Sequence, residues 1–216
     1  MACCLGLDLT CSERHPTAFA VLDKSGSLTE VGEFRLNEEM LQKIDSLGPC
    51  TVGIDAPLGL PRGLCCLEGN CACRQEDGSK GRACEHEVSR LGIGLFFTTK
   101  KSIIKGMVYR GITLKKVLEA KGHTVLEVYP YGAKVRLFGR PVPSKMRPDG
   151  LSFLRKHLAK LVPSSRQFVP TLTHDRCDAI LAAHTAHLYP LGKTEPLGDR
   201  DEGQIVLPLT RAQPEG

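Results

Sequence analysis

The sequence predicts an α/β protein in which a mixed β-sheet is flanked by helices. Short runs of apolar and β-branched residues alternate with longer segments whose apolar residues recur at helical spacing. The chain has 216 residues, of which 41% are hydrophobic and 25% charged, and this composition is typical of a folded globular domain. Three strand patterns precede the first helical pattern, so we expect the element order βββαβ at the start of the chain.

The first part of the chain contains the residues expected to form this core. Apolar runs bounded by polar or glycine-containing turns predict three strands, at residues 3–9, 17–23 and 29–36. Asn37 can cap a helix that continues to about residue 47, because the apolar residues of this segment recur at helical spacing. Residues 51–55 then predict a fourth, buried strand.

The middle of the chain combines a long loop with helices and one strand. Residues 59–85 are rich in Gly, Cys and Pro, which predicts a Cys-rich insertion after the fourth strand. The spacing of apolar residues predicts three more helices, at residues 102–121, 151–161 and 175–188. A fifth strand is expected at residues 124–129, where Pro130 ends it.

One domain without a membrane-spanning segment is expected. Residues 1–190 are predicted to form the domain, and residues 191–216 a loosely packed tail with a short strand at residues 204–207. The first residues contain no basic leader and too few apolar residues for a signal peptide. No run approaches the roughly 18 apolar residues of a membrane helix. We therefore expect a cytoplasmic protein that has no membrane partner.

Basic residues are unevenly distributed along a chain whose net charge is +5. Residues 98–166 contain 16 of the 29 basic residues and only three acids. Such a segment is expected either to attract a polyanion such as nucleic acid or to form the solvated faces of helices. The candidate substrate-binding side chains lie on both sides of the fifth strand, at Lys100, Lys101, Lys105, Arg136, Arg140, Lys145 and Arg147.

Carboxylates beside buried apolar sequence are the main functional signal. Asp8 and Asp55 end the first and fourth strands, so both emerge at one edge of the sheet if these strands are parallel neighbours. Asp175 and Asp178 share a helix face, and Glu127 adds a candidate from the fifth strand. Hard oxygen ligands of this kind suit Mg²⁺ or Mn²⁺. The alternative is a structural role for each acid, as a helix cap or as a hydrogen-bond acceptor.

Four motifs are spaced along most of the chain, namely Gly6-Leu7-Asp8, Gly53-Ile54-Asp55-Ala56-Pro57, Glu127-Val128-Tyr129-Pro130 and His174-Asp175-Arg176-Cys177-Asp178. In these motifs the sequence resembles the domain of unknown function 429 family, a branch of the ribonuclease H-like superfamily that is commonly described as predicted nucleases. The resemblance implies a ribonuclease H-like mixed sheet. It also implies that Asp8, Asp55 and Asp178 bind a divalent metal ion, with Asp175 and Glu127 as further catalytic candidates. Resolvases of this fold act as dimers, so a dimer is one expected state, although no dimer helix is identifiable.

Three functions from different classes follow from these observations. We favour a divalent-metal-dependent nuclease that hydrolyses phosphodiester bonds by a one- or two-metal mechanism. The first alternative is a non-catalytic nucleic-acid or protein-binding module with a metal-stabilised insertion. The second is an ATP-dependent phosphotransferase of the actin-like superfamily, because Asp8-Leu9-Thr10-Cys11-Ser12 resembles a phosphate loop. The chain is short for the two domains of such an enzyme.

The chain contains ten cysteines, which is unusual for an expected cytoplasmic protein and is the second feature that points to a function. Four of them in the insertion supply enough thiolates for a tetrahedral structural zinc site, at Cys66, Cys71, Cys73 and Cys84. Cys65 and His86 lie close to them in the sequence. Disulfides in an oxidising compartment and unligated thiols are the alternatives.

Overall fold

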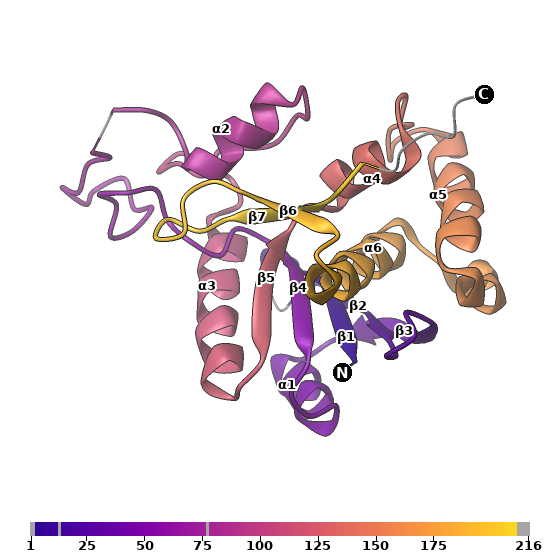
Figure 1. Ribbon diagram of the computed structural model, residues 1–216. Coiled ribbons are helices and arrows are strands. Elements are labelled where there is room, and N and C mark those ends of the chain that lie inside the picture. The colour runs from indigo at the N-terminus through magenta and orange to yellow at the C-terminus, as the bar shows by residue number, and fades with distance from the viewer. Residues whose placement is uncertain (1–2, 13, 77, 211–216) are drawn as a thin grey trace.

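A seven-stranded mixed sheet forms the centre of the computed structural model, which describes residues 3–12, 14–76 and 78–210 (Figure 1). The strands are β1 (Cys4–Asp8), β2 (Thr17–Leu22), β3 (Leu28–Phe34), β4 (Thr51–Asp55), β5 (Thr124–Val128), β6 (Thr194–Leu197) and β7 (Ile205–Pro208). The helices are α1 (Asn37–Ser46), α2 (Ala83–Arg90), α3 (Lys105–Ala120), α4 (Pro130–Phe138), α5 (Pro148–Leu161) and α6 (His174–Leu188). Short 3₁₀ helices follow α5 and α6, at Pro163–Thr171 and Tyr189–Leu191. The predicted α/β class is confirmed.

The sheet has the strand order β3-β2-β1-β4-β5-β7-β6. Strands β1, β2 and β3 form an antiparallel meander, whereas β4 lies parallel to β1, and β5 lies parallel to β4. The predicted order βββαβ is therefore observed, with α1 as the helix. Because β1, β4 and β5 are parallel neighbours, their carboxyl ends meet at one edge of the sheet, as expected for a ligand-binding edge.

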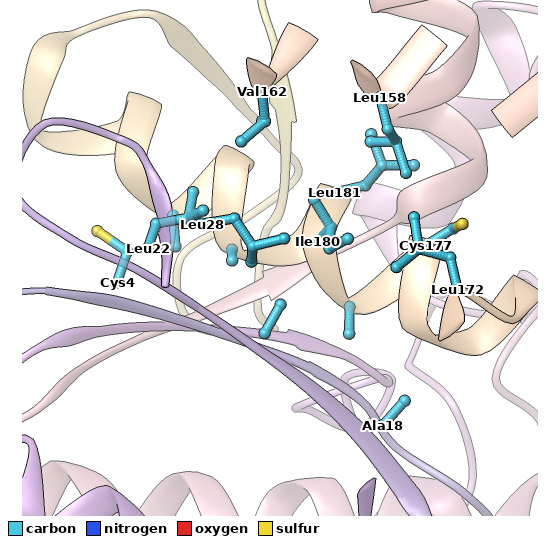
Figure 2. Close-up of a cluster of buried hydrophobic side chains, with 14 of the residues drawn as sticks. Cys4, Ala18, Leu22, Leu28, Leu158, Val162, Leu172, Cys177, Ile180 and Leu181 are labelled. Atoms are coloured by element: carbon cyan, nitrogen blue, oxygen red, sulfur yellow. The ribbon is translucent and has the colours of Figure 1, made fainter. Parts of the chain in front are cut away.

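Helices cover both faces of the sheet. On one face α1 and α3 pack against Leu5, Leu7 and Phe19. On the other face α5 and α6 pack against Cys4, Ala18 and other strand side chains that point away from α1 and α3. Figure 2 shows this cluster. This alternation follows from the two-residue repeat of a strand, which sends successive side chains to opposite faces. Figure 1 shows α6 between the sheet and α5.

Two glycines allow α6 to lie directly on the sheet. A Cβ atom added to Gly6 in β1 would lie 2.0 Å from the carbonyl oxygen of Ala179, and one added to Gly53 in β4 would lie 2.6 Å from that of Ala182. Both contacts are with the backbone of α6, so a larger residue would displace the helix. The small residues of α6 and these glycines together fix the distance between the helix and the strand ends.

Two helices were missing from the sequence-based prediction. Pro130 was interpreted as the end of a strand, but it occupies the first turn of α4, where a proline costs no hydrogen bond. The helix α2 overlaps the end of the expected insertion. It was not predicted because its eight residues include few apolar side chains, of which Cys84 and Val88 are buried. The long helix begins at Lys105, three residues later than expected.

Much of the predicted tail belongs to the sheet. Strand β7 pairs in parallel with β5, and β6 pairs with β7 in antiparallel orientation. All four residues of β7 are buried, which explains why a strand pattern was visible at residues 204–207. The strand β6 contains Pro196 and lies at the edge of the sheet, where a proline is tolerated. Residues 211–216 of the predicted tail lie outside the described residues.

The predicted Cys-rich insertion follows β4, as expected. Residues 59–80 contain no helix or strand among the residues described, and only Pro61 and Leu67 of this segment are buried. Leu67 is fully buried, and its backbone N–H donates to the Tyr109 hydroxyl of α3 at 2.7 Å. In the described part of the chain, no helix is both long enough and apolar enough to cross a membrane.

Candidate functional site

Asp8 and Asp55 lie side by side at the carboxyl ends of two parallel strands. They are register partners in the β1–β4 pair, and so are Gly6 and Gly53 two residues earlier. Because residues two apart in a strand share a face, both aspartates are on the α6 face of the sheet. The repeated spacing of glycine and aspartate therefore places two carboxylates beside the helix that the glycines allow to approach.

The helix α6 supplies the third carboxylate. Thr173 caps its N-terminus by accepting a hydrogen bond from the Arg176 N–H, at 3.2 Å. Asp178 follows in the second turn and is only 2% exposed, in contrast to Asp175, whose side chain is 67% exposed. Asp178 lies close enough to both strand-end aspartates for its charge to raise their pKa values.

Two lysines neutralise Asp178. The Nζ atom of Lys134 in α4 lies 2.5 Å from Asp178 Oδ1, and that of Lys145 lies 2.6 Å from Oδ2. Lys134 is buried, whereas half of the Lys145 side chain is exposed, and its Nζ atom also lies 3.8 Å from Asp175. Burial lowers the pKa of Lys145, but the charge of Asp178 and its hydrogen bond outweigh burial and raise that pKa above its usual value.

Asp8 and Asp55 have no such neutralisation. Among the described residues, no basic side chain forms a salt bridge with either carboxylate. Burial, followed by the charge of Asp178, raises the pKa of Asp8 from 3.8 to about 7. Burial, followed by the charge of Asp8, also raises the pKa of Asp55 well above its usual value. The charges of Lys145 and Lys134 lower both pKa values but do not outweigh burial and the neighbouring carboxylates. Carboxyl groups whose pKa values are raised in this way are common at functional sites.

A cavity of about 630 Å³ opens beside these groups. Its lining includes Asp55, Asp178, Lys134, Lys145 and His174, together with apolar side chains from the segments before α3 and after α4. Burial, followed by the charge of Lys145, lowers the pKa of His174, so its neutral form is favoured. The cavity is large enough for a nucleotide-sized group and brings acidic and basic side chains to the same surface.

Glu127 lines the same cavity but is fully paired. Arg82 donates to both of its carboxylate oxygens, at 2.7 and 2.5 Å, and the Leu58 N–H donates to Oε2 at 2.7 Å. Arg82 also contacts Glu85, which accepts hydrogen bonds from Thr98. Burial lowers the pKa of Arg82, but Glu127 outweighs this effect and raises it. The structure thus places Glu127 in a buried ion-pair network at the wall of the cavity.

Most of the predicted basic clamp lies elsewhere, because these side chains have partners outside the cavity. Lys100 donates to the carbonyls of Cys71 and Cys73, and Lys105 forms a salt bridge with Glu68. Arg136, Arg140 and Arg147 contact Glu195, Gly92 and Asp149 respectively, and Lys101 is exposed. Of the group, Lys145 alone lines the described cavity. Lys134 was not predicted as a site residue. The sequence feature that could have identified it is a basic residue on the buried side of α4, a helix that was not predicted.

The cysteine cluster differs by one residue from the predicted zinc ligands. The Sγ atoms of four cysteines lie within 4.8 Å of one another, and these are Cys65, Cys66, Cys71 and Cys73. This group could hold a metal ion such as zinc. The prediction of Cys84 as a ligand was wrong, because Cys84 is buried in α2 against Val88 and Leu197. All ten cysteines are free thiols, so no disulfide is formed.

The three aspartates are more widely spaced than the cysteines. Among the described residues, the cysteine cluster is the single group of three or more Cys, His, Asp or Glu side chains whose ligand atoms all lie within 4.8 Å. The oxygen donors of Asp8, Asp55 and Asp178 nevertheless suit a hard divalent cation. The raised pKa values of Asp8 and Asp55 show where an added positive charge would relieve repulsion. In donor type the three carboxylates are therefore compatible with such a cation, and their wider spacing would have to close around it.

The family model described as "Protein of unknown function (DUF429)" matches residues 6–203. This match spans all three aspartates, the two lysines and the cysteine cluster. No curated protein is similar enough in sequence to count as a relative of the chain.

Proposed function

The chain belongs to the DUF429 family of proteins of unknown function, and we propose that it is a divalent-metal-dependent nuclease with a ribonuclease H-like fold. One observation supports this function above the others, which is the convergence of Asp8, Asp55 and Asp178 at the carboxyl edge of the sheet. The order βββαβ, with a later helix supplying the third acid, agrees with the implied superfamily. Carboxylates of this kind can bind metal ions that activate a water molecule, so a phosphodiester can be hydrolysed without a nucleophile from the protein.

Mg²⁺ or Mn²⁺ is the proposed cofactor, held by Asp8, Asp55 and Asp178. When bound, such an ion would act as a Lewis acid on a phosphoryl oxygen and lower the pKa of a water molecule. Asp8 and Asp55 lie on adjacent strands whose register is fixed by backbone pairing, so they offer a rigid pair of oxygen ligands. Asp178 comes from α6, whose position over Gly6 and Gly53 is fixed by backbone contact.

Lys145 is the proposed phosphate contact. It lines the cavity, half of its side chain is exposed, and its ammonium group already binds the carboxylate of Asp178. A phosphate oxygen from a substrate can replace that carboxylate oxygen as the acceptor, which would release Asp178 toward the cation. Lys134 is buried, so in our proposal it stays beside Asp178 and limits the negative charge that builds up at the site.

Nucleic acid is the proposed substrate and partner. Of the 29 basic residues, 16 lie between residues 98 and 166, and this segment includes α4 and the residue Lys145 beside the cavity. In this proposal Lys145 contacts the phosphate backbone beside the carboxylates, and the basic side chains farther away add long-range attraction. The substrate class within nucleic acids depends on surface shape, so the test uses several substrates.

A non-catalytic nucleic-acid-binding module is the second candidate. It is favoured by the two lysines beside Asp178, whose positive charges already balance a carboxylate that a catalytic cation would need. In this reading the lysines and the acids form a binding surface that is neutralised without metal.

A cleavage panel separates the two functions. The protein would be incubated with single-stranded, duplex, hybrid and branched DNA and RNA in Mg²⁺, in Mn²⁺ and in EDTA. The nuclease proposal predicts products on at least one substrate in Mg²⁺ or Mn²⁺ and none in EDTA. Binding to the same substrates in a gel-shift assay, without products under any of these conditions, would favour the binding module.

A further inference from the structure

Four cysteine sulfur atoms converge in a segment that has almost no apolar core. Residues 59–80 form neither helix nor strand in the described part of the segment, and the buried residues there are Pro61 and Leu67. Ordering a chain of this length without a core has a large entropic cost, which is commonly offset by a metal ion or by cross-links. Figure 1 shows the segment extending outward beside α2 and α3.

The sulfur positions agree with one tetrahedral ion. All four Sγ atoms lie within 4.8 Å of one another, and those of Cys65 and Cys71 are 3.6 Å apart. With Zn–S bonds of about 2.3 Å, the edges of a regular tetrahedron are about 3.8 Å long. The observed sulfur group therefore needs only small side-chain adjustments to surround an ion. A single ion would use all four sulfurs at once, whereas each disulfide would join only two of them.

Hydrogen bonds already hold the thiols of the cluster close together. The Cys73 Sγ atom donates to the Cys66 carbonyl oxygen at 3.7 Å, and the Sγ atoms of Cys65 and Cys71 lie 3.6 Å apart. Metal binding would replace these thiol contacts, because the ligating sulfurs lose their protons. A site of four thiolates and one Zn²⁺ has a net charge of about −2, so nearby positive charge is favourable.

Lys100 provides such a charge without blocking the sulfurs. Its Nζ atom donates to the backbone carbonyls of Cys71 and Cys73, at 2.6 and 2.8 Å. The ammonium group therefore lies beside two of the four cysteines and holds their backbone in place. This contact also explains why Lys100 lies away from the carboxylate cavity.

We propose that Cys65, Cys66, Cys71 and Cys73 bind one structural Zn²⁺ as four thiolates. The thiol protons leave to solvent as the four Zn–S bonds form, so no oxidant or reductant is needed. The coordination shell is complete without water, which marks the site as structural. Its role is to hold residues 59–80 in one conformation against α3, where Leu67 and Glu68 contact Tyr109. The proposal is independent of the nuclease function.

Metal content is the first test, on full-length protein purified under reducing conditions without a chelator. We expect one zinc per chain by elemental analysis, and cobalt substitution is expected to give the visible absorption bands of a tetrahedral thiolate site. Cys65→Ser should lower zinc content at least tenfold, whereas Cys11→Ser, at an exposed cysteine outside the segment, should leave it unchanged. Cys84→Ser distinguishes the ligand set, because zinc loss in Cys84→Ser with retention in Cys65→Ser would overturn the proposal.

Proteolysis tests the structural role. Arg62 and Arg74 lie in the segment, so trypsin is expected to cut there many times faster after zinc removal, while circular dichroism of the sheet and helices stays unchanged. Restoring zinc should restore protection. Three results would overturn the proposal: protein that holds neither zinc nor cobalt although its thiols are reduced, a Cys65–Cys71 disulfide detected by mass spectrometry in protein kept reduced, or bound iron with sulfide instead of zinc.

Discussion

Asp8 and Asp55 are register partners on parallel strands, each two residues after a glycine on which α6 rests. The same glycine spacing therefore brings the helix close and places both carboxylates beneath its second turn, where Asp178 lies. Burial and the charge of Asp178 raise the pKa of Asp8 to about 7, and burial and the charge of Asp8 raise that of Asp55 well above its usual value. Such repulsion lowers the stability of the folded protein when both carboxyls are ionised.

Replacing Asp8 with Asn is expected to stabilise the metal-free protein at pH 8. The native Asp8 carboxyl keeps its proton up to about pH 7, whereas the unfolded one loses it near 3.8. The native state thus binds more protons between these values, so stability falls as the pH rises through this range. Asn removes this loss, and the free energy of unfolding at pH 8 should rise by about 1–4 kcal/mol.

Urea unfolding at pH 4 and pH 8 measures this effect. Near pH 4, where native Asp8 is protonated, the variant and wild type should be almost equally stable. The fall in stability of the wild type between pH 4 and pH 8 should be smaller in Asp8→Asn and in Asp55→Asn. A loss of stability in Asp8→Asn at pH 8 would contradict the repulsion derived from the structure.

Gly6→Ala is expected to displace α6. The added Cβ would lie 2.0 Å from the Ala179 carbonyl oxygen and 2.2 Å from the Ala183 nitrogen, and neither backbone atom can move alone. The loss in free energy of unfolding should be about 3 kcal/mol or more, at the upper end of overpacking effects. Gly94→Ala is the matched control, since nothing lies within 4 Å of a Cβ at that position. Equal stability of the two variants, measured by denaturant unfolding, would argue against close helix contact.

The fold could be predicted where local pattern and tertiary contacts agree. Strands β1, β2 and β4 are buried on both faces, and their apolar runs were visible in the sequence. The position of Asp8 and Asp55 at one edge of the sheet was expected if the first and fourth strands were parallel neighbours, which they are. The helix α4 was missed because Pro130 both ends a strand pattern and suits a first helical turn. Strand β6 has a weak pattern, since it is a short edge strand that contains a proline.

Only part of the site could be predicted. The spacing of residues along the chain shows which side chains of one helix or strand lie together, but not which side chains of different elements meet. Asp8 and Asp55 were singled out by their positions at strand ends, and only the family resemblance favoured Asp178 over Asp175 on the same helix face. Lys134 was missed because its pairing with Asp178 depends on how α4 packs against α6. The pairing of Glu127 with Arg82 was equally hidden, since 45 residues separate the two in the chain. For the same reason Cys84 was predicted in place of Cys65, because the sequence did not show which cysteine lies beside Cys66, Cys71 and Cys73.

Asp178→Ala is expected to destabilise the protein more than Lys134→Met. Removing Asp178 leaves the buried ammonium of Lys134 without its partner, which typically costs about 3–5 kcal/mol. Removing Lys134 leaves Asp178 paired with Lys145, so the loss should be smaller. Thermal and denaturant unfolding of both variants would measure the difference. A larger loss in Lys134→Met would show that the lysine contributes mainly by packing.

Glu127→Gln tests whether this residue is structural. The change removes one charge from the buried Arg82 pair, so we expect a loss of about 3–5 kcal/mol in the free energy of unfolding. A double-mutant cycle of Arg82→Met, Glu127→Leu and their double variant would measure the coupling of the pair, and Arg82→Met should cost the most because it also leaves buried Glu85 without its ion-pair partner. Unchanged stability in Glu127→Gln, combined with weaker Mg²⁺ binding, would instead assign Glu127 to the metal site.

Metal binding should be coupled to proton release. Because the pKa of Asp8 is about 7 and that of Asp55 is also raised, Mg²⁺ must displace protons from these groups below neutral pH. The apparent affinity is expected to increase about tenfold or more between pH 6 and pH 8. Calorimetric titration in two buffers of different ionisation enthalpy would measure the protons released. An affinity that does not change with pH would indicate binding elsewhere.

The most direct test is the initial rate of nucleic-acid cleavage by wild type, Asp8→Asn and Asp45→Asn in Mg²⁺ or Mn²⁺. Asp45 is an exposed aspartate on α1 and serves as the control for the loss of one carboxylate. We predict metal-dependent cleavage by wild type and Asp45→Asn, and a rate at least about a hundredfold lower in Asp8→Asn, which stays folded and still binds the substrate. Equal cleavage by Asp8→Asn and wild type would contradict the proposed site.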